Sequence, residues 1–567
     1  MTEQKWVLEG AQNSAQVKQL AQALDVPEII ARLLLNRGIT TPEAAQRFFA
    51  PSLAHLHDPF LMKDMDRAVA RLVRALRQRE RIMIYGDYDV DGITSVSMTC
   101  LLLRKLGADV VFYIPDRLRQ GYGLSEVGVR EAHRRGAKLI ISVDCGVTAT
   151  QEVALANALG VDVIICDHHE PRTILPEAVA VLDPKRPDCP YPFKELAGVG
   201  VTFKLLQGLF ATLRQDPSQV EEFVDYVAIG SAADIVPLVD ENRVLVAEGL
   251  KRLNSEPRKV GLQALLETAG LAGQEIGTGQ VVFIIAPRIN AVGRMGDALR
   301  AVRLLTTEVP QQARNIAAIL EAENRARKNI DEETFAQAVQ MVEADYDPAR
   351  DLALVLAQEG WHPGVLGIVA SRLAERFYRP TVMITLDREV GKGSARSIPG
   401  FDLYAALRQC EELLIEFGGH KYAAGLTVHR DRVDLFRARL QEVVGACLVD
   451  DLLVPKLRVD GEIRLSQITP KTFALLKKFA PFGPQNMRPV FVSRGLQVVG
   501  EARIVGDNHL KLKVRQDGIV IDAIGFNLGD LDYRVVPGEG NLDIAYVVEE
   551  NEFQGHRMLQ LRLKDLR

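Results

Sequence analysis

The stretch "RIMIYGDYDVDGITS" (residues 81–95) joins a short apolar run to three closely spaced aspartates, Asp87, Asp89 and Asp91. The apolar run has the length of a buried strand. Three carboxylates this close repel one another unless a cation neutralises them. The glycine after Asp91 leads into a helical stretch, and the N-terminus of a helix attracts phosphate. The stretch therefore predicts a strand, a cation-binding turn and a helix.

The same alternation of apolar runs and helical stretches continues along the chain. Further apolar runs lie at 108–115, 137–144 and 161–167, and amphipathic stretches lie between them at 125–136 and 148–160. This order indicates βαβ units with right-handed crossovers, and hence a doubly wound parallel sheet. Residues 198–255 read as helical and complete an α/β domain that we expect at 76–255.

Four other regions are expected around this domain. The periodicity predicts an N-terminal helical region packing on the core, a linker with one long helix at 310–346, a second α/β domain, and a β-barrel of about five strands. Their expected bounds are 1–75, 256–348, 349–450 and 451–567. Residues 455–567 carry 17 basic and 14 acidic residues, whereas the whole chain has a formal net charge of -5.

The composition is that of an ordinary globular protein. The 567 residues are 47% hydrophobic and 25% charged, and no apolar stretch reaches the length of a membrane-spanning helix. The N-terminus has no pattern of a secretory signal. Six scattered cysteines without a CxxC pair fit reduced thiols. We therefore expect a cytoplasmic protein that is not bound to a membrane.

Carboxylates and imidazoles follow several of the predicted strands. Asp144 ends one strand, the "DHH" of residues 167–169 ends the next, and Asp234 follows an apolar helix. The carboxyl ends of parallel strands meet at the edge of the sheet where ligands bind. Taken singly, an aspartate there is usually a helix cap and a histidine is usually packed in the core. We expect the spacing of Asp87, Asp89 and Asp91 in an extended segment to point all three the same way.

Such a cluster is costly unless cations neutralise it. Oxygen and nitrogen donors without thiolates suit Mg²⁺ or Mn²⁺. Two such ions held a few ångströms apart commonly promote the attack of water on a phosphodiester. The residues therefore predict a metal-dependent hydrolase of phosphate esters, with two ions.

The motifs at these positions resemble those of a known family. Four of them are similar to the motifs of DHH phosphoesterases: "YGDYDVDGITS" (85–95), "SVDCG" (142–146), "CDHHE" (166–170) and "GSAADIVPL" (230–238). Others resemble the linker and second domain of the bacterial RecJ family: "PRINAVGRM" (287–295), "WHPGVLGIVASRLAERF" (361–377), "GSARS" (393–397) and "FGGHKYAAG" (417–425). The resemblance covers nearly the whole chain.

The resemblance implies a DHH domain, a DHHA1 domain behind a long helix, and an OB-fold. It implies metal ligands at Asp89, Asp91, Asp144, His168 and Asp234, with Asp87 either a ligand or a partner of the ligands. Asp167 would orient its neighbours or cap a helix. Four residues would act near the scissile phosphate: His169, Arg288, Asn290 and Arg294.

The resemblance also implies a site for the DNA end in the second domain. Ser394, Arg396 and His420 would bind the 5′ phosphate, since a hydroxyl and a guanidinium suit a phosphate. Arg117 would face the same cleft, with Arg119 as the alternative.

The implied activity is that of a 5′→3′ exonuclease that cuts single-stranded DNA to 5′ mononucleotides in recombination and mismatch repair. The expected partners are a single-strand-binding protein and a RecQ-type helicase, and the chain is expected to act as a monomer. Two alternatives remain open. One is a phosphodiesterase of nano-RNA or cyclic dinucleotides, or a pyrophosphatase, although the terminal β domain favours a polymer. The other is an inactive scaffold, which would require lost metal ligands, and none is missing.

Overall fold

The computed structural model describes residues 4–10, 14–116, 120–345, 347, 350–447, 452–538, 540–553 and 556–567. These residues form two compact units. The larger unit contains Leu8–Gly293, Asp297–Glu321 and Arg458–Arg567, and the smaller contains the chain up to Val7, Arg294–Gly296 and Ala322–Leu457. The predicted fold class, an α/β protein with a second α/β domain and a terminal barrel, is confirmed.

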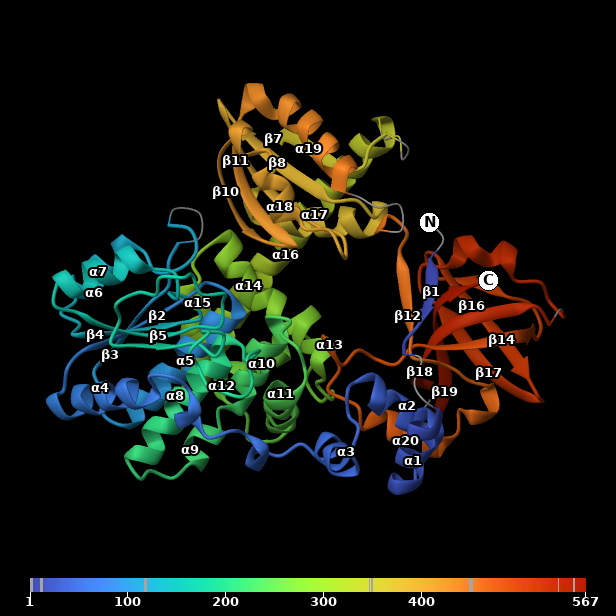
Figure 1. Cartoon of the computed structure of the whole chain (residues 1–567), viewed down its shortest axis with the longest axis horizontal. Helices are drawn as coiled ribbons and strands as arrows, with labels where there is room; N and C mark the ends of the chain where they lie inside the picture. Colours follow the sequence, from blue (N-terminus) through green and yellow to red (C-terminus); the bar gives the residue numbers. More distant parts are fainter. Residues whose placement is uncertain are drawn as a thin grey trace. The chain divides into compact units, whose positions relative to one another are not determined.

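The larger unit contains a five-stranded parallel sheet with helices on both of its faces (Figure 1). Its order is β3-β2-β4-β5-β6, where the strands are β2 (Ile82–Gly86), β3 (Val110–Tyr113), β4 (Leu139–Val143), β5 (Asp162–Cys166) and β6 (Ala180–Leu182). The chain adds β3 on one side of β2 and then β4 on the other. This reversal is the topological switch point of a doubly wound sheet, where the loops after two neighbouring strands diverge and leave room for a ligand.

The alternation of side chains along each strand sends them to two separate helical layers. Ile82 and Ile84 pack with α4 (Met65–Gln78), α5 (Val90–Lys105) and α8 (Gly198–Thr212). Met83 and Tyr85, which point to the other face, pack with α6 (Glu126–Arg134) and α7 (Thr150–Ala158). Both faces of the sheet are covered, which explains why these strands read as continuous apolar runs.

Helices extend this unit beyond the sheet, as the sequence predicts for 198–255. They include α10 (Val224–Ala233), α11 (Asp240–Leu253) and α14 (Ala286–Met295). The predicted long helix is α16, Pro310–Asp345, which begins in the larger unit and continues in the smaller.

The smaller unit contains a five-stranded sheet of order β10-β11-β9-β8-β7. The strands are β7 (Leu354–Glu359), β8 (Thr381–Asp387), β9 (Val390–Arg396), β10 (Leu414–His420) and β11 (Ala423–His429). One face packs on α17 (Pro363–Phe377), and the other packs on α18 (Leu403–Arg408) and α19 (Val433–Cys447).

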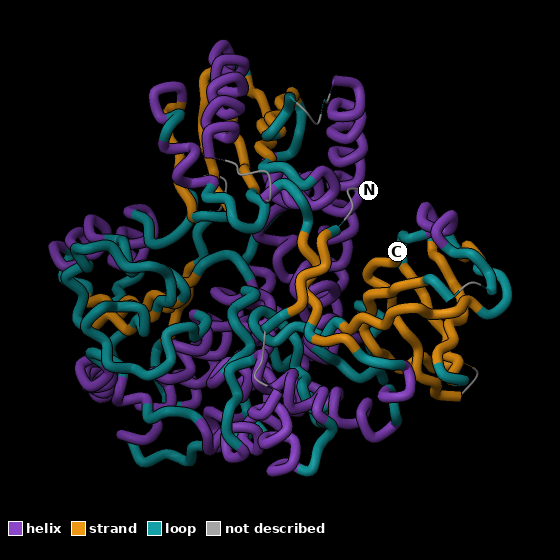
Figure 2. Tube along the Cα trace, turned by 45° about the vertical axis from the view of Figure 1, so that its right-hand side comes forward, coloured by secondary structure: helices purple, strands orange, loops and turns teal. Residues whose placement is uncertain are grey.

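The C-terminal strands close into a barrel, which is clear in Figure 2. The ring runs β14-β18-β19-β17-β16 and returns to β14 through the pairing of β14 with β16. Its strands are β14 (Phe491–Val498), β16 (His509–Gln516), β17 (Ile519–Gly525), β18 (Leu542–Phe553) and β19 (His556–Leu566). The predicted five-stranded barrel is confirmed, and the short strands β13 (Gly461–Glu462) and β15 (Arg503–Val505) are added at its edges.

The N-terminal region is helical except at its start, but its first three helices do not pack on the α/β core as expected. Lys5–Leu8 form strand β1, which pairs with β12 (Lys456–Val459). Helices α1 (Ser14–Leu24), α2 (Glu28–Asn36) and α3 (Pro42–Phe49) bury their apolar faces in the core of the barrel domain. In the described part of the chain, no helix combines the length and apolar composition that a membrane crossing needs.

Candidate metal centre

The three aspartates after β2 do not lie on an extended segment, so that expectation is wrong. Helix α5 already begins at Val90, and Asp89 is its N-cap, whose side chain accepts a hydrogen bond from the backbone N–H of Gly92. Asp91 therefore lies in the first helical turn. A Cβ at Gly92 would lie 2.5 Å from the carbonyl oxygen of Asp87, so glycine is what allows the loop to close this tightly on the helix. Helix capping and the turn, rather than strand alternation, bring the three carboxylates together.

The N-terminus of α8 orients the Asp91 carboxylate. One oxygen accepts from the backbone N–H of Gly198 at 2.8 Å and the other from that of Val199 at 2.7 Å. A helix N-terminus stabilises a carboxylate in this way. A Cβ at Gly198 would lie only 2.6 Å from Asp144 Oδ1, so this glycine lets the helix end approach the metal centre.

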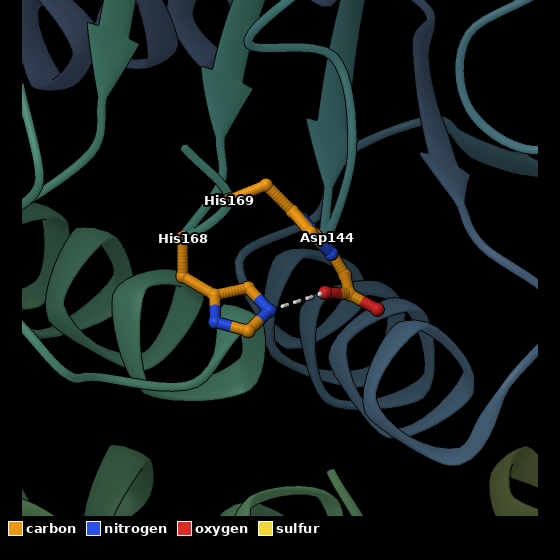
Figure 3. A group of neighbouring side chains, drawn as sticks. All are labelled: Asp144, His168 and His169. Carbon is orange, nitrogen blue, oxygen red and sulfur yellow. Dashed lines mark ion pairs between the residues drawn. The ribbon is translucent and has the colours of Figure 1, made fainter. Parts of the chain in front are cut away.

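Asp144 and His168 follow β4 and β5, and their side chains meet (Figure 3). His168 Nε2 lies 3.2 Å from Asp144 Oδ1. Asp144 has a φ of +60°, which an aspartate tolerates better than most residues. The structure thus brings these two residues together at the carboxyl edge of the sheet.

Asp234 enters the same cluster from the end of α10. Its Oδ2 lies 3.6 Å from His168 Nε2, and Asp91 Oδ2 lies 3.9 Å from the same nitrogen. Three sets of ligand atoms lie close enough to share an ion: Asp91 with His168 and Asp234, Asp87 with Asp89 and Asp144, and Asp144 with His168 and His169. The first two sets have no residue in common.

The electrostatics of the cluster favour a cation. Burial, and then the charges of Asp91 and Asp89, raise the pKa of the Asp144 and Asp234 carboxyls well above their usual range. Burial and the charge of Asp89 raise the pKa of Asp91 to about 7. Burial lowers the pKa of His168 to about 3, which leaves its ring neutral and able to coordinate.

The residues fit a metal centre in their hydrogen bonding as well. Asp144 Oδ1 and His168 Nε2 are buried and have no hydrogen-bond partner among the described residues. A divalent cation would satisfy both atoms and relieve the repulsion between the carboxylates. Carboxylate oxygens with one imidazole form a donor set suited to Mn²⁺, and to Mg²⁺ where oxygens dominate.

Asp167 orients its neighbours, which was one of the two roles expected for it. Its Oδ1 accepts from the backbone N–H groups of His168 and His169 and lies 2.7 Å from His169 Nδ1, while Oδ2 accepts from the N–H of Val147. Burial lowers the pKa of His169, but the hydrogen bond and charge of Asp167 outweigh it and raise that pKa to about 9. The Tyr122 hydroxyl donates to the Asp144 carbonyl and lies 3.0 Å from His169 Nδ1.

Two residues after β6 were missed by the sequence reasoning. Asp183 is fully buried at the same sheet edge, with Oδ1 accepting from the N–H of Lys185. The Lys185 ammonium lies 3.5 Å from Glu170, which follows His169. The signal was the apolar run "AVAVL" (178–182), a fifth strand followed by a carboxylate.

Helix α14 carries the residues expected near the scissile phosphate. A Cβ at Gly293 would lie 2.7 Å from the carbonyl oxygen of Tyr88, so the helix packs directly on the aspartate loop. The Arg288 guanidinium is nearly buried and forms an ion pair with Glu321 at 2.6 Å. Asn290 is half-buried on the same helix. Arg294 belongs to the smaller unit, where it donates to the carbonyl of Gly364.

The smaller unit brings Ser394, Arg396 and His420 to one face of its sheet. Arg396 lies opposite Ala423 of β11, and Ala423 lies opposite His420 of β10, so the three side chains share a face. Ser394, two residues before Arg396, points the same way and accepts a hydrogen bond from its guanidinium at 3.1 Å. Between them the strands carry Gly425 and Gly418, which leave the backbone bare.

Arg117, expected to bind the 5′ phosphate, and its alternative Arg119 lie outside the described residues.

Three family models match separate parts of the chain. They are the DHH family N-terminal domain at residues 81–231, the DHHA1 domain at 351–446 and the RecJ OB domain at 459–565. The single-stranded-DNA-specific exonuclease RecJ of Bacillus subtilis is 42% identical over 554 residues, which are 97% of this chain and 69% of that protein. The chain belongs to the RecJ family. The RecJ of Escherichia coli is 35% identical and matches over 96% of both chains.

Solved structures of RecJ share this fold. The crystal structure of Thermus thermophilus RecJ in complex with Mn²⁺ gives a TM-score of 0.85 at 32% identity and covers 99% of this chain and 79% of that one. The same RecJ in complex with Mg²⁺ gives a TM-score of 0.79 at 31% identity, over 99% and 78% of the two chains.

Proposed function

We propose that this RecJ-family chain hydrolyses single-stranded DNA from its 5′ end with two Mn²⁺ or Mg²⁺ ions and releases 5′ mononucleotides. Family membership makes the chain a metal-dependent exonuclease of single-stranded DNA. The direction and the number of ions are our inference. The observation that carries the two-ion proposal is the pair of ligand sets without a shared residue, Asp91–His168–Asp234 and Asp87–Asp89–Asp144.

The protein's own groups would prepare the site around these ions. When bound, the ions would supply Lewis acidity at the scissile phosphate and lower the pKa of water for in-line attack. The backbone N–H groups at the N-terminus of α8 orient the Asp91 carboxylate, and the Asp167 carboxylate orients the His169 ring. With its pKa raised to about 9, His169 is a cation at neutral pH and would stabilise negative charge on the phosphate.

We assign phosphate contacts to Arg288 and Asn290, because α14 packs on the aspartate loop. We assign the same role to Arg294 because it lies in the same motif, "PRINAVGRM" (287–295). The Arg288 guanidinium would leave its ion pair with Glu321 to bind the phosphate. Alternatively, it would keep that ion pair and orient helix α14.

The proposed polarity rests on a pocket for the terminal 5′ phosphate. Ser394, Arg396 and His420 offer a hydroxyl, a guanidinium and an imidazole on one face, and the glycines between them let a phosphate approach the backbone. Arg117, or Arg119, is assigned to the 5′ phosphate from the sequence motif alone. A pocket that accepts only a chain end would fix the register of each cut.

We further propose that the enzyme acts as a cytoplasmic monomer in recombination and mismatch repair. A RecQ-type helicase would supply single strands, and a single-strand-binding protein would deliver them. The β-barrel favours a polymer over a dinucleotide or pyrophosphate, because an OB-fold binds single strands by charge and stacking.

The test is a time course on a 40-nucleotide single strand labelled at either end, with Mn²⁺ and the full chain. The proposal predicts that a 5′ label is released at once as a mononucleotide, whereas a 3′ label stays on shortening fragments. Asp144→Ala should lower the rate by about 10³-fold or more, a loss typical of essential groups in a site. Asp109→Asn is the matched control. Asp109 forms a surface ion pair with Arg81 before β3, so its substitution should leave the rate of hydrolysis unchanged.

The reverse order of label release would contradict the polarity. Hydrolysis only of dinucleotides would favour the small-substrate alternative, and a fully active Asp144→Ala variant would contradict the metal centre.

A further inference from the structure

Ile235 occupies a backbone position that helices usually give to glycine. Helix α10 ends at Ala233 with Asp234 as its C-cap, so Ile235 is the first residue beyond the cap. Its φ is +61°. Glycine is the common residue there, and a side chain branched at Cβ is disfavoured in this left-handed conformation. The sequence therefore places a strained residue next to a proposed metal ligand.

Packing does not compensate for this strain. Ile235 is 61% exposed, whereas Val236 and Leu238 on the same turn are buried. The turn itself is held firmly, because the N–H of Leu238 donates to the carbonyl of Pro484 and the Asn242 amide donates to that of Pro237. The fixed turn presents an apolar side chain to solvent.

The place of Ile235 in the chain, directly after Asp234, limits what its side chain can contact. The Asp234 carboxylate lies 3.6 Å from His168 Nε2, and consecutive Cα atoms are about 3.8 Å apart. Ile235 therefore lies at the margin of the metal centre. It cannot bind a metal or a phosphate. The apolar surfaces that a nucleotide brings to such a centre are the faces of its sugar and base.

We propose that Ile235 packs against the sugar and base of the nucleotide whose phosphodiester is cut, and so positions that nucleotide over the metal centre. The inference rests on the proposed function and deepens it. It explains why a strained and exposed isoleucine stands where glycine or asparagine would stabilise the fold. Strain at functional sites is held by the surrounding structure in this way.

The test exploits opposite effects on stability and activity. Ile235→Asn accepts the left-handed conformation and removes the apolar contact. We expect its Tm to rise, while KM for single-stranded DNA rises by about tenfold, the effect of losing one apolar side-chain contact. Its affinity for Mn²⁺, measured by calorimetry without DNA, should stay unchanged. The conservative Ile235→Val should restore the wild-type KM.

Arg214→Asn is the matched control. Arg214 is also the first residue beyond a helix cap, that of α8 at Leu213, with a φ of +53° and an exposed side chain. It lies at the opposite end of α8, about 22 Å from the metal centre. We expect a higher Tm and no change in kcat/KM.

Three results would overturn the inference. They are a wild-type KM in Ile235→Asn, a loss of Mn²⁺ affinity that accounts for its lower activity, or an equal rise in KM in Arg214→Asn. If the asparagine variant does not fold, Ile235→Gly replaces it, because glycine relieves the same strain and also removes the apolar contact. The same rise in KM is then expected. A wild-type chain that fails to cut single-stranded DNA would instead refute the proposed function, and this inference with it.

Discussion

Gly198 controls how closely α8 can approach the metal centre. Its N–H donates to Asp91, and a Cβ at this position would lie 2.6 Å from Asp144 Oδ1. We predict that Gly198→Ala moves the helix end or the Asp144 carboxylate and lowers Mn²⁺ affinity by about 10- to 100-fold, as the loss of a partner that orients metal ligands does. Calorimetric titration of Mn²⁺ measures the change.

Gly200→Ala is the control for that variant. A Cβ there would meet only the movable side chain of Leu196, at 3.2 Å. Wild-type affinity in Gly198→Ala would contradict the role that we assign to the α8 terminus.

At the scale of residues, the sequence predicts which groups assemble but not how they are held. Asp144 and His168 could be predicted because strand ends share an edge. The contact of Asp91 with the N-terminus of α8 could not, since it joins residues more than a hundred positions apart. Asp183 and Lys185 were missed because β6 has only three residues, so the apolar run at 178–182 is a weak signal of a strand.

At the scale of elements, one arginine joins three segments of the larger unit. Arg243 of α11 is buried, stacks on Phe48 of α3, and donates to the carbonyls of Phe48, Lys478, Phe479 and Ala480. Most of these carbonyls follow helix α20 (Pro470–Lys477) of the barrel domain. The guanidinium therefore binds the catalytic domain to the N-terminal helices and to the barrel domain.

We predict that Arg243→Met lowers the free energy of unfolding by about 3 kcal/mol, because several buried carbonyls lose their donor at once. Urea denaturation followed by circular dichroism measures the loss. Lys251→Met, on the exposed face of the same helix, removes only a surface ion pair with Glu248 and should change stability by less than about 0.5 kcal/mol. Equal stability of the two variants would show that Arg243 does not join the segments.

The elements themselves were largely predictable. Residue periodicity predicted the parallel sheet, the 36-residue helix α16 and the five strands that close the barrel. The short strands β1, β13 and β15 were not predicted, because their pairing depends on distant partners. The alternating aspartates favour an extended segment, but helix α5 already begins at Val90, before Gly92.

At the scale of the whole molecule, we assign one proposed site to each of the two units of the chain. The metal centre is built from strand ends and helix termini of the larger unit. The proposed 5′-phosphate pocket is built from one sheet face of the smaller unit. An exonuclease requires both functions, since cutting alone gives no preference for an end.

The central claim is that the larger unit holds two catalytic ions in ligand sets without a shared residue. The most direct measurement is the number of Mn²⁺ ions bound per chain, by calorimetry on metal-free protein. The variants Asp234→Asn and Asp89→Asn each alter one of the two ligand sets. We predict two ions in the wild type and one in each variant, because each substitution removes a ligand from one set only. One ion in the wild type, or two in both variants, would contradict the claim.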